Sequence, residues 1–158
     1  MGGLHPDLAK SLNLEFWLMS FAAVMTELEE MHRADLQRSP RERFGHILLT
    51  DDHIGRWGIS AAMSRSELYD RIAIYLARGF YRSKLEFTFC DGIVNDVHAV
   101  ITKADERRPE LFWEVFLAFD AGEFYRNNDR SRDPVEVYTR PLIAKVVEKH
   151  STDYPDVG

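Results

Sequence analysis

The sequence has a single cysteine, Cys90, among its 158 residues. An intrachain disulfide needs two cysteines and a four-cysteine zinc site needs four, so both are excluded. A lone thiol is more usual in the reducing cytosol than in a secreted protein. We therefore expect a cytoplasmic protein.

The sequence also lacks a long apolar run. Its most apolar early stretch, residues 14–25, is interrupted by Glu15 and is too short to span a bilayer. That stretch has neither a basic leader nor a small-residue cleavage site, so it does not resemble a signal peptide. We expect no membrane segment.

Positive charge is in deficit: Lys and Arg number 20 against 26 Asp and Glu, which gives a formal net charge of −6. An acidic chain repels a phosphate backbone overall, so a nucleic-acid role would need a local basic patch. The arginine-rich stretches at 38–43 and 126–132 contain or adjoin acidic residues and lack interleaved aromatics. We expect no nucleic-acid partner.

The common catalytic motifs are missing as well. The chain has no P-loop, no G-x-G-x-x-G, no H-E-x-x-H, no G-x-S-x-G and no zinc-finger spacing. Their absence does not exclude catalysis, but it removes the most direct sequence evidence for an enzyme. We expect a protein without a cofactor, and we favour a non-enzymatic one.

The chain does show helical periodicity. Hydrophobic residues make up 45% and charged residues 29%, which is typical of a globular domain. Leu18, Phe21, Met25 and Leu28 continue a pattern of three- and four-residue steps that starts at Leu14. This spacing predicts a long helix from an N-cap at Asn13 to about residue 37.

Several segments punctuate this helical pattern. The glycines and paired aspartates of residues 50–58 predict a break. Pro141 lies inside a later helical pattern and should kink or split it. Leu85, Phe87 and Phe89 alternate like a strand, but one short strand cannot form a sheet, so we expect a helix there.

The most apolar segment, residues 111–119, points hydrophobic side chains in every direction around a helix axis, with Glu114 as its only charge. A helix that is apolar all round is a central one. We predict an all-α fold: one domain, residues 1–158, with five or six helices bundled around a central helix at about residues 109–121. We expect flexible ends at about residues 1–5 and 151–158.

One polar stripe could bind a ligand. Asp91, Asn95 and His98 fall within about 60° of one another on a helix, so their oxygen and nitrogen atoms form a row. Such a row could hold a metal or a polar molecule, with Glu114 facing it from the central helix. Because apolar residues occupy the opposite side of the same helix, the row could equally be a solvated face.

Arg56 and Trp57 are a candidate interface pair. An exposed tryptophan beside an arginine is typical of residues that dominate protein–protein binding. The alternative is that Trp57 covers the core.

The sequence supports two classes of function. In size, acidity and helical character it resembles small bacterial immunity and inhibitor proteins, which implies action by protein–protein interaction, either inhibitory or regulatory. An acidic surface would steer binding to a basic partner. A homodimer formed through the Leu14–Leu28 helix is a further possibility. The alternative is a helical-bundle enzyme, or a metal- or small-ligand-binding protein, that uses Asp91, Asn95 and His98.

Overall fold

The computed structural model describes residues 3, 5–154 and 156, and its regular structure is entirely helical. In chain order the elements are α1 (Pro6–Leu36), α2 (Pro40–Arg43), α3 (Asp51–Ser60), α4 (Arg65–Tyr81), α5 (Phe87–Lys103), α6 (Glu110–Asp120), the π-helix η1 (Val135–Thr139) and α7 (Arg140–Lys149). The predicted all-α single domain is confirmed. The described part of the chain has more helical elements than the predicted five or six, because α2 and α3 are separate helices and η1 precedes α7.

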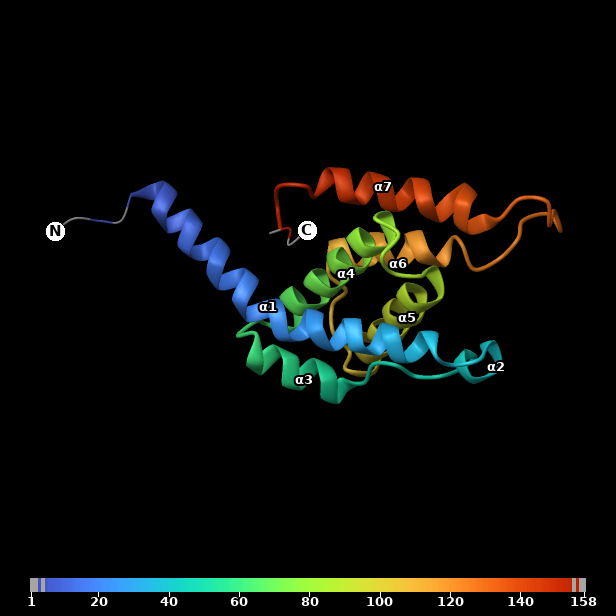
Figure 1. The fold of residues 1–158 in the computed structure, drawn as a ribbon, viewed down its shortest axis with the longest axis horizontal. Helices are drawn as coiled ribbons and strands as arrows, with labels where there is room; N and C mark the ends of the chain where they lie inside the picture. Colours follow the sequence, from blue (N-terminus) through green and yellow to red (C-terminus); the bar gives the residue numbers. More distant parts are fainter. Residues whose placement is uncertain (1–2, 4, 155, 157–158) are drawn as a thin grey trace.

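Two helices share the centre of the bundle (Figure 1). The predicted central helix is α6, which packs against α4, α5 and α7. Helix α4 packs against α3, α5, α6 and α7 and contributes more buried residues than α6 does. Because Leu117 of α6 is exposed, the apolar circumference of that helix is not fully enclosed.

Helix α1 begins earlier than predicted. Its N-cap is His5, whose Nδ1 accepts a hydrogen bond of 3.3 Å from the backbone N–H of Asp7. Pro6 follows at the first helical position, where its missing N–H costs nothing. The prediction of Asn13 as the cap was wrong, and the side chains of Asn13 and Leu14 lie outside the described part. The first half of α1 projects beyond the other helices (Figure 1).

The predicted break at residues 50–58 is wrong, because Asp51–Ser60 form α3. The aspartates that suggested a turn lie in the first helical turn, where the helix dipole favours anions. Ile54 and Trp57 of this helix are buried in the core. Their packing compensates for the low helix propensity of two glycines.

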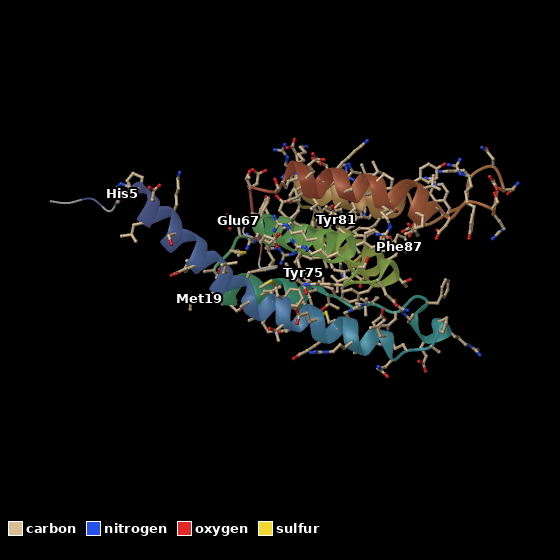
Figure 2. The ribbon with its side chains drawn as sticks, turned by 45° about the horizontal axis from the view of Figure 1, so that its top comes forward. His5, Met19, Glu67, Tyr75, Tyr81 and Phe87 are labelled. Atoms are coloured by element: carbon tan, nitrogen blue, oxygen red, sulfur yellow. The ribbon has the colours of Figure 1, made fainter. Side chains whose placement is uncertain are left out.

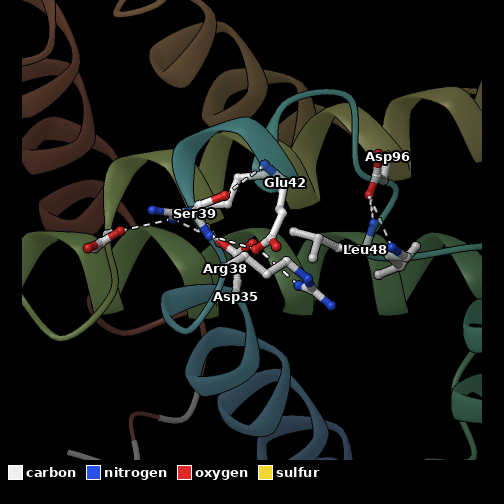
Figure 3. Close-up of polar contacts among 9 residues, drawn as sticks. Asp35, Arg38, Ser39, Glu42, Leu48 and Asp96 are labelled. Atoms are coloured by element: carbon white, nitrogen blue, oxygen red, sulfur yellow. Dashed lines mark hydrogen bonds and ion pairs between the residues drawn. The ribbon is translucent and has the colours of Figure 1, made fainter.

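Hydrogen bonds to side chains fix the corner between α1 and α3 (Figure 3). Ser39 and Glu42 form a capping box at the start of α2. The chain is then extended up to α3, and Asp96 of α5 accepts hydrogen bonds of 2.7 and 3.0 Å from the N–H groups of Leu48 and Leu49. These bonds replace the backbone pairing that an extended segment would otherwise lack.

The segment at residues 85–89 enters a helix, as predicted: α5 starts at Phe87 with Glu86 as its N-cap. Just before it, the chain folds back over Gly79, whose carbonyl accepts hydrogen bonds from Lys84 and Leu85. A Cβ on Gly79 would lie 2.4 Å from Cδ1 of Leu85. The absence of a side chain at Gly79 thus leaves room for the side chain of Leu85.

The predicted interruption at Pro141 is confirmed. The helix changes from π to α geometry at Arg140, one residue before the proline. Proline cannot donate a backbone hydrogen bond to the preceding turn, and a wider turn accommodates that loss.

The predicted flexible ends fall partly outside the described residues. At the C-terminus the structure describes Ser151–Tyr154 and Asp156; Tyr154 contacts α4, and Asp156 contacts the C-cap residue of α4, Arg82. Within the described residues, no helix is long and apolar enough to cross a bilayer.

Candidate binding cleft

A cleft of about 460 Å³ lies between α1 and α4. Its basic side chains are Arg33, Arg71, Arg78, Arg82 and Lys84, and its acidic ones are Glu29 and Asp156. Among the described residues that line the cleft, five are cationic and two are acidic, whereas the chain as a whole has a net charge of −6. The cleft is therefore a local basic site on an acidic protein.

Three of the arginines of the cleft lie on one face of α4 and its C-cap residue, Arg82. Arg71, Arg78 and Arg82 stand at positions i, i+7 and i+11, which lie within about 40° of one another on a helix. The apolar periodicity of this segment predicts a helix but does not reveal the arginine stripe. The seven- and four-residue spacing of arginines within an apolar helix was the signal that could have found it.

Two of these arginines are buried. The exposed fractions of Arg71 and Arg78 are 4% and 6%. Burial and the neighbouring Arg78 lower the pKa of Arg71 to about 10. Burial also lowers the pKa of Arg78. With a pKa of about 10 the Arg71 guanidinium remains charged at neutral pH, and in this buried setting a carboxylate would be attracted to it more strongly than in water.

Apolar side chains form the rest of the cleft. Phe21 and Met25 come from α1, and Tyr75 of α4 lies between the two helices in Figure 2. The rings of Phe21 and Tyr75 meet edge to face with centroids 6.5 Å apart. Arg71 also lies 5.2 Å from the Phe21 ring centroid. A ligand for this cleft would combine negative charge with apolar surface.

The structure divides the predicted stripe on α5 into two environments. Asn95 is exposed, and its Nδ2 donates to the Asp91 carbonyl and to Oε1 of Glu123, at 2.8 and 3.0 Å. Asp91 is half-buried, and its Oδ1 is buried without a hydrogen-bond partner. Burial, together with the nearby carboxylates of Glu123 and Asp120, raises the pKa of Asp91 to about 8.

His98 belongs to an aromatic cluster on α6. Its ring centroid lies 5.7 Å from that of Trp113 and 4.6 Å from that of Phe116. Burial and the nearby Arg108 lower the pKa of His98, so the imidazole is neutral at pH 7. The stripe is thus not a uniformly solvated face, because α6 packs across part of it.

Glu114 contacts a different helix from His98. Its Oε1 accepts a hydrogen bond of 2.8 Å from Nζ of Lys149 in α7. Trp113 and Phe116 are the α6 residues that contact His98. The expectation that Glu114 would face the α5 stripe has no support in these contacts.

Arg56 and Trp57 both bind Glu27 of α1. Arg56 forms a two-pronged ion pair with Glu27, at 2.6 and 3.2 Å, and Nε1 of Trp57 donates to the same carboxylate at 2.9 Å. Arg56 is the main cause of the lowered pKa of Glu27. The interface interpretation required an exposed indole, whereas Trp57 is 1% exposed, so the alternative that Trp57 covers the core is the correct one.

Metal binding and similarity to known proteins give no further assignment. The described residues contain no group of three or more His, Cys, Asp or Glu side chains placed to hold a metal ion. Comparison of the chain with protein-family models, curated proteins and solved structures gives no match.

Proposed function

We propose that this protein is a non-enzymatic interaction protein that binds an acidic segment of a partner protein in the cleft between α1 and α4. The observation that carries this proposal is the excess of cations in the cleft of an otherwise acidic chain. An immunity-like, inhibitory or regulatory role would operate through such binding. The proposed location is the cytoplasm, in keeping with a sole cysteine that is a buried thiol.

The basic cleft changes the expected charge of the partner. The net charge alone favours a basic partner, because opposite charges steer encounter. At close range the local potential decides, and in the cleft that potential is positive. Arginine forks suit carboxylates, and the apolar residues beside them suit a peptide with alternating acidic and apolar side chains.

Binding of a labelled peptide tests this function. We expect a fluorescein-labelled peptide of alternating glutamate and leucine to bind with an affinity that falls as salt concentration rises. Arg33→Glu, an exposed change on the cleft wall, should weaken binding about tenfold, because a charge-assisted hydrogen bond contributes about 1.5–3 kcal/mol. Fluorescence anisotropy at several salt concentrations measures both effects.

The matched control is Arg41→Glu, the same charge change at an exposed residue of α2 outside the cleft. The affinity of this variant for the peptide should stay within about twofold of the wild-type value. Equal weakening by both variants would show that the peptide senses only net charge and would refute the site. Preference for a lysine–leucine peptide or for a single-stranded oligonucleotide would refute the proposed partner class.

A second candidate is self-association through the projecting half of α1. Leu8, Phe16 and Met19 lie within about 80° of one another on this helix, and Phe16 and Met19 are 58% and 78% exposed. Met19 lies on the side of α1 away from α4 (Figure 2). We propose a second copy of this chain as the occupant of this face, because two such arms carry little charge that would repel.

A Met19→Glu variant tests self-association. The wild-type protein should show a concentration-dependent rise toward twice the monomer mass by light scattering coupled to size exclusion. Met19→Glu should remain a monomer, because it places a carboxylate in the apolar contact. Ile59→Glu, at an exposed position of α3, is the control and should behave like wild type. A wild-type protein that stays monomeric at every concentration would contradict this candidate.

A further inference from the structure

Described residues of the protein's own C-terminal segment contact three arginines that line the cleft. After α7 the chain turns back and runs beside α4 (Figure 1). Nδ1 of His150 and Oδ2 of Asp153 lie 2.9 Å apart within this turn. Asp156 lines the cleft together with the α4 arginines.

Each arginine of the α4 stripe contacts a different chemical group of this segment. Arg78 donates through Nη2 to the backbone carbonyls of His150 and Tyr154, at 3.2 and 3.0 Å. The guanidinium of Arg71 lies 5.7 Å from the centroid of the Tyr154 ring. Arg82 forms an ion pair with the carboxylate of Asp156. From Arg71 to Arg82 the stripe thus contacts an aromatic ring, peptide carbonyls and a carboxylate in succession.

These contacts are those of a peptide-binding site. Burying Arg71 and Arg78 costs desolvation energy, which polar and aromatic contacts offset. The cleft still holds about 460 Å³ beside the segment, so the segment fills only part of the space between α1 and α4. The remainder has the same mixture of charge and apolar surface.

We propose that the described part of the C-terminal segment, residues 151–154 and 156, is a built-in competing ligand of the cleft. The partner segment that displaces it has the same chemistry: an aromatic side chain followed two residues later by a carboxylate. This inference rests on the proposed function and adds the partner's recognition pattern and its regulation. A tethered segment acts at a millimolar effective concentration. It therefore prevents the binding of weak ligands, and a ligand of higher affinity displaces it.

A peptide supplied in trans tests the competition. The probe is a fluorescein-labelled synthetic peptide with the sequence of residues 151–158, and the protein is the full chain. In the double variant Tyr154→Ala, Asp156→Asn, the tethered segment loses its ring and its carboxylate. We expect this variant to bind the peptide about tenfold more tightly than wild type does. Thr152→Ala, an exposed change in the same segment, should bind like wild type.

Changes to the peptide test the recognition pattern. Replacing its tyrosine by alanine, or its second aspartate by asparagine, should weaken binding to the double variant severalfold. Unchanged thermal melting of the double variant would show that the fold is intact. If its melting temperature falls strongly, the single variant Asp156→Asn takes its place, and this variant should show a smaller gain in affinity for the peptide. Equal affinity of wild type and both variants for the peptide would overturn the proposal.

The outcomes separate this inference from the function on which it rests. If the glutamate–leucine peptide binds the cleft but releasing the segment changes no affinity, the function stands and the competition is refuted. If neither peptide binds any form of the protein, both are refuted. If only the peptide of residues 151–158 binds, the segment docks in the cleft but the general preference for acidic segments is wrong.

Discussion

Replacing Trp57 by alanine is expected to destabilise the protein by about 3–5 kcal/mol, because the change removes a fully buried aromatic side chain and leaves a cavity. It also deprives the Glu27 carboxylate of the indole donor. Trp57→Phe keeps a ring in the core and loses the hydrogen bond, so it should cost less. Chemical denaturation followed by circular dichroism gives the free energies of unfolding.

The control for Trp57 is Ile59→Ala on the same helix. Ile59 is 85% exposed, so its truncation should change the free energy of unfolding by less than about 0.5 kcal/mol. If Trp57→Ala left the stability unchanged and abolished binding to a partner, Trp57 would be an interface anchor and not a core residue.

Replacing Asp91 by asparagine is expected to stabilise the protein at pH 8, by an amount on the order of 3 kcal/mol, and to leave its stability at pH 4 nearly unchanged. Burial and two neighbouring carboxylates raise the folded-state pKa of Asp91 above its unfolded value. The folded protein therefore binds more protons than the unfolded chain between about pH 4 and pH 8. Over that range wild-type stability should fall as pH rises.

Thermal unfolding across this pH range checks the sign. Asparagine has no proton to lose, so the Asp91→Asn variant should show a flatter dependence of stability on pH. Asp105→Asn, at an exposed position with φ of 54° that asparagine tolerates, is the control and should follow the wild-type curve. A wild-type protein whose stability rises from pH 4 to pH 8 while Asp91→Asn destabilises it would contradict the raised pKa.

Most of the fold could be predicted from the sequence because the apolar spacing of its helices is regular. The segment at residues 50–58 could not, because Gly55 and Gly58 weaken the local signal and the burial of Ile54 and Trp57 decides the outcome. The start of α1 was also missed. His5 and Pro6 mark the N-terminal end of this helix, whereas the apolar pattern used to place the helix begins later in the sequence.

The candidate site was less accessible to sequence reasoning. The helical positions of Asp91, Asn95 and His98 were right, but one helix cannot reveal which neighbour packs across it. That neighbour is α6, whose Trp113 and Phe116 contact His98. The cleft depends on α1, α4 and the C-terminal segment meeting in space, so only the arginine spacing on α4 could have indicated it.

The central claim is that the cleft between α1 and α4 binds acidic peptide segments. The most direct test is to titrate the isotopically labelled full chain with the glutamate–leucine peptide and follow every backbone amide by NMR. The largest shifts should occur at Arg33, Arg78, Arg82 and their neighbours in the cleft. A peptide that binds while its shifts are confined to the first half of α1, or to the α5–α6 surface around Asp91, would contradict the claim.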